Sequence, residues 1–486
     1  MKTRYLSFTA AMTALAFGQG CAVGPNFHRP AAPQVRAYAP PPAFQPSTAP
    51  DAQHIVQGMD VPARWWTLFQ SPALDGLVDQ AIANNPDTAA AEAALRQARE
   101  LLYAQRGAYL PTVSGSFDAT RARNSATISP PLADNSSIYS LYTAQLAVSY
   151  TPDVFGGVRR QVEAATARAE SQAFQTQAAY LTLTANVVQA ALQEASLREQ
   201  IDATGRIIAA ELELLALMQR QHKAGEIAGG DVAAQETALA QAEQSLPPLQ
   251  KQLAQERDLL AVLGGRFPAD GPSGTIEISA LALPLQVPIG LPSTLVERRP
   301  DIRAAEANLH NASALVGVAV AARLPNITLS ANGGSAAASL AGLASGPNAF
   351  WTLAGGLTEP IFDAGALRHQ QKAAEAAYDQ ARDQYRSTVL QAFQNVADTL
   401  QALQLDDESL RAAQRAEAAG RRSLTIAQKQ VQLGETSAFA VLNAEQAFHQ
   451  ASIALIQAQT ARYTDTVALF QALGAGEWPS RSQASS

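Results

Sequence analysis

The chain of 486 residues is poor in charge, in aromatic residues and in cysteine. Charged residues make up 16% of it and the net charge is −7, so the excess of basic residues that nucleic-acid binding requires is missing. The single cysteine, Cys21, excludes an internal disulfide. Beyond the N-terminus there is no apolar run of the roughly 18 residues that a membrane span needs. We therefore expect no transmembrane helix in the mature chain.

The motifs of common enzymes are also missing. The sequence has no GxSxG element, no glycine-lysine phosphate loop and no cluster of residues with metal-ligand spacing. The acidic run 406–408 falls within a helical pattern, and its simplest interpretation is a solvated helix face. We expect no enzyme activity, no cofactor, no metal and no nucleic-acid partner.

The N-terminus has the features of an export signal. Basic residues precede a short apolar segment, and small residues then lead to Cys21, so 1–20 is predicted to be a signal peptide. We predict that Cys21 is lipidated, although Gly18 stands where lipoprotein signals usually carry leucine. The alternative is an ordinary signal peptide followed by a free cysteine. The proline-rich stretch 21–62 is predicted to be a lipid-anchored, extended arm.

Two very long helices dominate the rest of the chain. The stretch 158–223 contains no proline and one glycine, Gly205, and as a helix it would be roughly 100 Å long. Its larger apolar residues recur at helical spacing, which is typical of a helix packed along a coiled-coil-like seam. A second such helix is predicted over 367–433.

An internal repeat organises the mature chain. Asn85-Pro86-Asp87 recurs as Arg299-Pro300-Asp301. Further landmarks recur at separations along the chain that are slightly shorter than the separation of this pair. Those landmarks are Phe155-Gly156 with Phe362-Asp363, Gly225-Glu226 with Gly434-Glu435, and Leu263-Gly264 with Leu473-Gly474. Each copy has the pattern helix, two strands, long helix, sharp turn, return helix.

The repeat divides the chain after the arm into a first repeat 63–264, a connector 265–292, a second repeat 293–474 and a tail 475–486. The predicted strands are 112–124, 140–150, 326–334 and 350–358, the turns 224–232 and 433–441, and the return helices 232–263 and 441–473. Pro247-Pro248 is expected to kink or break the first return helix.

The strands alternate between apolar and small polar residues, which is typical of outer-membrane barrel strands. A half-buried soluble sheet gives the same alternation. Because four strands cannot close a barrel, several chains would have to contribute to one. The loops 125–137 and 335–348 would then face outward. The predicted lipid-facing residues are Val113, Phe117, Tyr142, Leu146, Val148, Tyr150, Ile327, Leu329, Trp351, Leu353 and Leu357.

The turns that join long and return helices are the candidate gate. Gly225 and Gly434 are suited to end a helix, and Asp231 is predicted to cap the next one. One interpretation is that these turns simply connect the two helices of a hairpin. The other is that they form a constriction where helix tips converge, and the two interpretations are compatible. The predicted gate residues in these turns are Gly225, Glu226, Asp231, Gly434 and Glu435.

Several motifs resemble the TolC/NodT-type outer membrane factor family. They are Cys21-Ala22-Val23-Gly24-Pro25-Asn26-Phe27 with Arg29-Pro30, Trp65-Trp66 with Phe69, and the block from Leu291-Pro292-Ser293 through Arg299-Pro300-Asp301 to Ala305-Glu306. The resemblance implies a mainly α-helical chain with β-strands, in which three copies form one 12-stranded outer-membrane β-barrel. It also implies a periplasmic α-helical barrel and an equatorial belt formed by the connector and chain ends.

The resemblance further implies the outer-membrane duct of a tripartite efflux system. The implied partners are two further copies of the chain, a periplasmic adaptor, an inner-membrane transporter of the RND type and outer-membrane lipid. The alternatives are a type I secretion channel for proteins and a lipid-anchored periplasmic coiled-coil protein. The resemblance also implies that the adaptor contacts the tip residues, and it adds Asn443 to the predicted gate. The sequence departs from the family at the second tip, where Ala440 and Asn443 replace frequent aspartates and put strong cation selectivity in doubt.

Overall fold

The computed structural model describes residues 22–33, 35, 37–38, 53–58, 61–123, 138–289 and 292–474. Cys21, the predicted signal peptide, the whole predicted loop 125–137 and the tail 475–486 lie outside the described residues. The chain divides into two compact units. We call them the sheet unit (Met1–Arg29, Leu95–Gln172 and Ala305–Tyr385) and the hairpin unit (Pro30–Ala94, Ala173–Ala304 and Arg386–Ser486).

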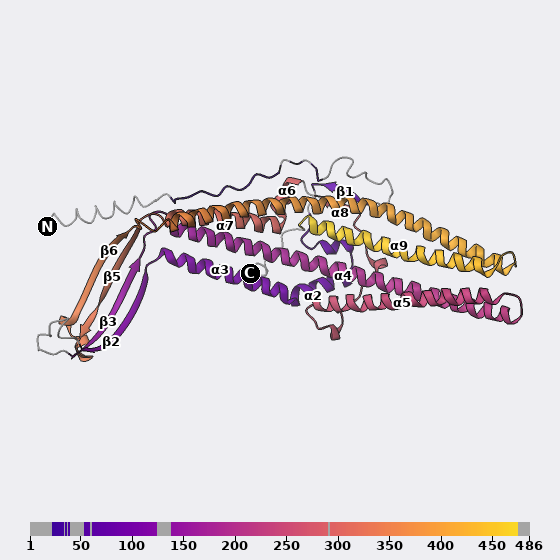
Figure 1. Ribbon diagram of the computed structural model, residues 1–486, viewed down its shortest axis with the longest axis horizontal. Helices are drawn as coiled ribbons and strands as arrows, with labels where there is room; N and C mark the ends of the chain where they lie inside the picture. Colours follow the sequence, from indigo (N-terminus) through magenta and orange to yellow (C-terminus); the bar gives the residue numbers. More distant parts are fainter. Residues whose placement is uncertain are drawn as a thin grey trace. The chain divides into compact units, whose positions relative to one another are not determined.

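The sheet unit contains one antiparallel sheet of four strands (Figure 1). The strand order is β2-β3-β5-β6, with β2 over Thr112–Arg123, β3 over Ile138–Tyr150, β5 over Asn326–Ala337 and β6 over Ala349–Thr358. Residues 335–337, predicted to start a loop, extend β5 because they continue its pairing with β3, as in Ser335 opposite Ala144. Two 3₁₀ turns, Ala341–Ala344 and Gly346–Asn348, complete that connection.

Helices enter and leave this sheet at one end. Helix α3 (Pro86–Arg106) precedes β2, and α7 (Pro300–Ala321) precedes β5. In the sheet unit, α3 packs on the start of α4 through Leu102, Val162 and Ala169. We call the end of the sheet next to these helices the helix end, and the end where β2 leads to β3 and β5 leads to β6 the loop end.

The two long helices and their return helices match in length. Helices α4 (Gly157–Lys223) and α8 (Ala366–Gln432) have 67 residues each, and α5 (Gly229–Leu263) and α9 (Ala438–Ala472) have 35 each. The predicted long helices are therefore confirmed almost to the residue. Both return helices begin three residues earlier than predicted.

One constant offset relates all four helices, since 366 − 157 and 472 − 263 both equal 209. Two sequence-based pairings were therefore slightly wrong. Gly265, with φ +71°, matches Gly474, with φ +79°, whereas Gly264 does not have a positive φ. Gly156, with φ +78°, likewise matches Gly365, with φ +85°.

Pro247-Pro248 was predicted to kink or break the first return helix, and it does not break it. Helix α5 continues through both prolines to Leu263. Each proline removes one backbone donor, but the rest of the 35-residue helix stays hydrogen-bonded on either side of them.

The repeated X-Pro-Asp motif closes each repeat in the hairpin unit. The Asn85 side chain donates to the Leu263 carbonyl at 3.1 Å. In the second copy the Arg299 guanidinium donates to the Ala472 carbonyl at 2.7 Å. The residue before each proline thus binds the C-terminal end of the return helix, where carbonyls lack helical partners.

The core of the hairpin unit includes the tandem tryptophans. Trp65, Trp66 and Phe69 in a 3₁₀ turn (Trp65–Phe69) are fully buried, and Trp65 lies 5.7 Å from Phe470 of α9 between ring centroids. They are packing anchors. Helix α2 (Pro72–Asn84) follows this turn.

The connector forms structure that the sequence did not reveal. A short strand β1 (His54–Gln57) pairs in parallel with β4 (Gln286–Ile289). One 3₁₀ turn, Pro268–Asp270, follows α5, another, Ile278–Ala280, precedes β4, and the short helix α6 (Pro292–Arg298) follows β4. The arm predicted to be merely extended therefore contributes a strand.

Candidate functional site

The first hairpin tip is closed by a glycine cap after α4. Gly225 has φ +80°, and its N–H donates to the His222 carbonyl at 2.9 Å. The next N–H, from Glu226, reaches the Gln221 carbonyl at 2.9 Å. This pair of bonds is the Schellman cap, which satisfies the last carbonyls of a helix.

The second tip repeats that geometry. Gly434 has φ +73°, its N–H donates to the Val431 carbonyl at 3.0 Å, and the Glu435 N–H reaches the Gln430 carbonyl at 2.8 Å. A Cβ added at either glycine would meet nothing within 4 Å. Glycine is therefore required at both tips for its backbone conformation and not for lack of space.

Asp231 does not cap α5 in the predicted way. The helix begins at Gly229 with Ala228 as N-cap, and the Ala228 N–H donates to the Asp231 carboxylate at 3.3 Å. Asp231 is thus the third residue of α5, where its negative charge interacts favourably with the positive end of the helix dipole. At the second tip the constant offset places Ala440 at the matching position, so that carboxylate is absent there.

The structure brings five of the six predicted gate residues to the two turns. Glu226 and Glu435 are exposed beside their glycines, and Asp231 is half-buried. Asn443 is exposed on α9, beyond the second turn. The assignment of these residues to a gate remains a prediction.

A buried polar cluster lies behind the tips and was not predicted. Gln235 of α5 is fully buried, and its amide donates to the Glu211 carboxylate and, at 3.2 Å, to the Glu211 carbonyl on α4. Glu445 of α9 is 8% exposed. Its burial and the nearby Glu211 charge raise the pKa of Glu445 to about 7. Burial also raises the pKa of Glu211.

Two oxygens of this cluster have no hydrogen-bond partner. They are Gln235 Oε1 and Glu445 Oε2, and both are buried. Unpartnered buried acceptors are costly, and a proton on Glu445 would convert one acceptor into a donor. The signal in the sequence was a glutamate within the apolar run Val441-Leu442…Ala444, all of which are buried.

A second pair of carboxyl groups lies between α8 and α9. Burial, and then the hydrogen bond and charge of Asp465, raise the pKa of Asp406 to about 7. Asp407 binds Arg411 at 2.9 Å and the buried Arg462 at 3.4 Å. The prediction that 406–408 forms a solvated face is therefore wrong for Asp406 and Asp407, because α9 covers this side of the helix.

The ladder shows on which face of the sheet the predicted residues lie. The ladder pairs Val113 with Val148, Leu146 with Gly333, and Gly333 with Trp351. Since paired residues share a face, all eleven predicted apolar residues lie on one face. The other face carries Thr112, Ser114, Ser116, Asp118, Gln145, Ser149, Ser330, Asn332 and Thr352.

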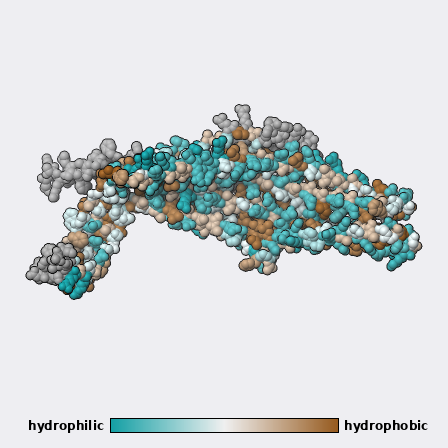
Figure 2. Space-filling view, in the orientation of Figure 1, coloured by the Kyte–Doolittle hydropathy of each residue, from teal (hydrophilic) through white to brown (hydrophobic). Residues whose placement is uncertain are grey.

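Much of the apolar face is exposed in the part of the chain that the structure describes. Phe117 is 57% exposed, Leu146 62%, Trp351 81% and Leu353 75%. Figure 2 shows pale and brown residues along the strands. A patch of exposed apolar side chains this continuous marks a surface that contacts something other than water.

The segment just after Cys21 is fastened inside the sheet unit. The guanidinium of Arg160 donates to the carbonyls of Val23 and Gly24 and to the Asn26 side chain, the last at 2.8 Å. A Cβ on Gly24 would come within 2.5 Å of Gly317. This contact explains the glycine in the motif that follows Cys21.

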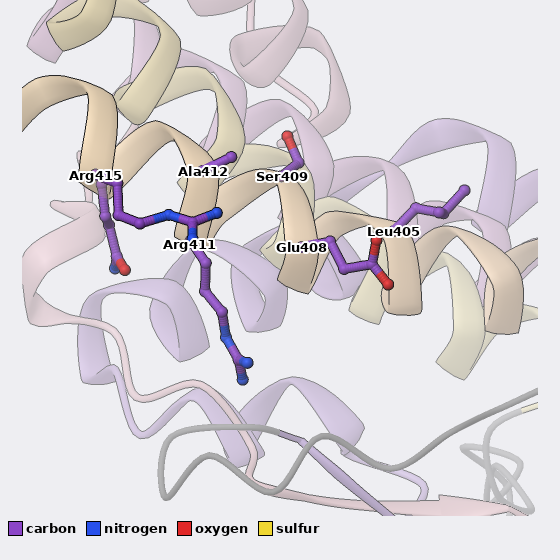
Figure 3. Close-up of a pocket in the computed structure, with 7 residues that line it drawn as sticks. Leu405, Glu408, Ser409, Arg411, Ala412 and Arg415 are labelled. Atoms are coloured by element: carbon purple, nitrogen blue, oxygen red, sulfur yellow. The ribbon is translucent and has the colours of Figure 1, made fainter.

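A groove of about 860 Å³ lies along α8 (Figure 3). It is lined by Leu405, Glu408, Ser409, Arg411, Ala412, Gln414 and Arg415, all from one helix. The lining contains no histidine or cysteine, and Arg411 is already paired with Asp407. It contains no arrangement of a nucleophile with a base.

Among the described residues, no helix has both the length and the apolarity to cross a membrane. In the same part of the chain, no group of three or more histidine, cysteine, aspartate and glutamate side chains is arranged to hold a metal ion.

Comparison with known proteins defines the class. A model of the outer membrane efflux protein family matches residues 77–266 and 291–475, one segment for each copy of the repeat. The chain belongs to this family and is an efflux channel protein of the outer membrane.

Individual relatives match over most of the chain. The pyoverdine export outer membrane protein OpmQ of Pseudomonas putida is 32% identical over 85% of this chain and 87% of its own length. The probable efflux pump outer membrane protein TtgC of Pseudomonas putida is 31% identical over 98% of this chain and 96% of its own length. The solved outer-membrane channel OprN superposes with a TM-score of 0.84 at 28% identity, covering 94% of this chain and 99% of OprN.

Proposed function

We propose that three copies of this chain form the passive exit duct of a tripartite efflux system for small molecules. The observation that carries the proposal is the four-stranded sheet with one apolar face. Its two edge strands, β2 and β6, are each paired on one side only among the described residues. An open sheet edge is not stable in hydrocarbon, because its backbone groups have no partners there.

Closure between copies removes both edges. If β2 of one copy pairs with β6 of the next, three copies make 12 strands from four each. The apolar face then contacts lipid and the serine-rich and threonine-rich face lines a polar passage, as in other barrels with water inside. The passage itself needs no catalytic residue, so we infer that the protein is not an enzyme.

The helices extend the duct. A helix of 67 residues measures roughly 100 Å, enough to reach well into the periplasm from an outer-membrane barrel. The two glycine-capped tips are the proposed gate and contact site for a periplasmic adaptor, which would connect the duct to an inner-membrane transporter of the RND type. Opening would be a small rearrangement of packed helices at the tips.

The relatives' names support a small-molecule cargo. Their names cite pyoverdine and efflux pumps, which favours small molecules over the alternative of secreted protein. The assignment to small molecules is tested by deleting the gene for this chain in its host and measuring sensitivity to a panel of antibiotics, solvents and chelators. Unchanged sensitivity together with loss of a secreted protein would overturn the small-molecule assignment.

Lipidation of Cys21 is part of the proposal. Replacing Cys21→Ser should abolish labelling by a palmitate analogue and leave the trimer in the membrane, because the barrel itself anchors it. Complete loss of the trimer in this variant would show that the lipid, and not the barrel, holds the protein in the membrane.

Cross-linking tests closure between copies directly. In the Cys21→Ser background, cysteines at Ser114, Ser116 or Asp118 of β2 are combined with Thr352→Cys of β6. Closure predicts oxidised dimers and trimers on denaturing gels. The matched control joins Ala147 and Asn332, which pair within one chain, and should give monomers only. The same monomer pattern for all β2–β6 pairs would contradict the shared barrel.

A further inference from the structure

The sheet carries few charges, and their placement is uneven. Its four strands contain only three charged residues, Asp118, Arg121 and Arg123. Asp118 lies on the polar face, opposite Thr143. Both arginines lie on the apolar face, Arg121 opposite Ser140 and Arg123 opposite Ile138, and both are exposed.

The two arginines mark one end of the apolar face. They are the last two residues of β2 on this face, at the loop end of the sheet. In Figure 2, strongly hydrophilic residues gather at this end of the strands. At the helix end the same face carries Val113, Tyr150, Ile327 and Leu357, and no charged residue of the four strands lies there.

Their height fits the boundary of a membrane. Arg123 follows Val113 by ten residues on the same strand, which is about 33 Å along a strand at 3.3 Å per residue. With the strand tilt of roughly 40° found in membrane barrels, this is about 25 Å along the membrane normal, the usual height of the apolar band. Arg123 therefore comes at headgroup level, where a charge is tolerated far better than at the bilayer centre. Arg121, two residues earlier, lies about 5 Å lower, a distance that its long side chain can span to reach the headgroups.

An arginine at this level needs an anion of matching shape. A guanidinium forms two parallel hydrogen bonds with a phosphate, and no acidic side chain lies on this face of the strands. We propose that Arg121 and Arg123 form a docking site for a phosphate-bearing lipid of the outer leaflet, whose acyl chains cover the apolar residues below. This inference rests on the proposed barrel, which places the loop end outward.

The experiment uses the full-length protein in detergent, with bisphosphorylated lipid A as the probe. Binding is measured by native mass spectrometry for the unaltered protein, for Arg121→Gln/Arg123→Gln and for Arg96→Gln/Arg99→Gln. The last variant is the matched control, because it removes two exposed arginines from α3 at the other end of the strands. Enzymatically dephosphorylated lipid A and inorganic phosphate are compared as ligands.

We expect the unaltered protein and the α3 control to prefer the phosphorylated lipid by on the order of tenfold, and the β2 variant to lose this preference. Equal binding of both lipids by the unaltered protein would overturn the site, as would a preference retained by the β2 variant. Competition by millimolar inorganic phosphate would instead show a site for free anions. An unaltered protein that forms heat-modifiable, conducting trimers but shows no lipid preference refutes only this inference, whereas failure of the unaltered protein to insert refutes the proposed duct.

Discussion

The sheet and the helical hairpins are stabilised in opposite ways. The sheet turns its apolar residues outward and has three charges in its four strands, so its stability depends on what surrounds it. The hairpins bury acidic and amide groups, such as Glu211, Gln235 and Glu445, between helices. The stability of such a sheet is therefore determined by its surroundings, and the stability of the hairpins by contacts within the chain.

The largest effect is expected on the apolar face of the sheet, which we propose contacts lipid. Phe117→Arg with Tyr142→Arg should prevent insertion, because both residues lie near the middle of the strands on the apolar face and each charge near the bilayer centre costs about 2–4 kcal/mol. The control Ser116→Arg with Thr143→Arg places the same charges at similar positions on the polar face and should insert. Heat-modifiable trimers in outer-membrane fractions measure both. Normal trimers in the first variant would show that the apolar face does not contact lipid.

The next effect tests the buried acids of the hairpins. The pKa of Glu445 is raised from 4.5 to about 7 in the folded chain, so the folded state holds a proton that the unfolded state releases between these values. The resulting stabilisation is complete below about pH 4.5 and is lost as pH rises to 7, by up to about 3 kcal/mol.

Glu445→Gln keeps the neutral shape and should remove this pH dependence. Hydrogen exchange of amides in α5 and α9 at pH 5, 6 and 7.5 measures it. In the unaltered protein the free energy of opening α5 and α9 should fall as pH rises. In the variant it should not show this fall. Parallel pH profiles for both proteins would mean that Glu445 is not protonated in the fold.

The same contrast explains which features of the structure could be predicted from the sequence. Alternation along each strand is a property of local sequence, so the apolar face was predictable down to residues such as Leu353. The repeat made the helix bounds of α4 and α8 predictable in the same way. The burial of Asp406 and Glu445 depends on α9 lying against other helices, and no local pattern reports that contact. The pairing of β1 with β4 was missed for the same reason, since it joins residues far apart in the chain.

A smaller effect concerns the caps of the tips. Gly434→Ala places a Cβ at φ +73°, which should destabilise the end of α8 by about 1 kcal/mol. The matched control is Gly205→Ala inside α4, where the added Cβ meets nothing within 4 Å and should stabilise the helix by about 0.5–1 kcal/mol. Local opening free energies from hydrogen exchange distinguish the two. Equal effects of the same sign would mean that the tip glycine is not needed for its backbone conformation.

The smallest effect on stability is expected from the charge difference between the tips. Ala440 is half-buried at the position that matches Asp231, and its N–H donates to the Ser437 carbonyl at 3.0 Å, as that of Asp231 does to Ala228 at 3.1 Å. Ala440→Asp should therefore fit the same turn and change stability by less than about 0.5 kcal/mol. Three added carboxylates at one level of a trimer would attract cations, so single-channel recordings should show a higher cation-to-anion permeability ratio. Asn443→Ser, which changes no charge, serves as the control. An unchanged ratio in Ala440→Asp would place the constriction away from the second tip, and the comparison between the hairpins would then be structural only.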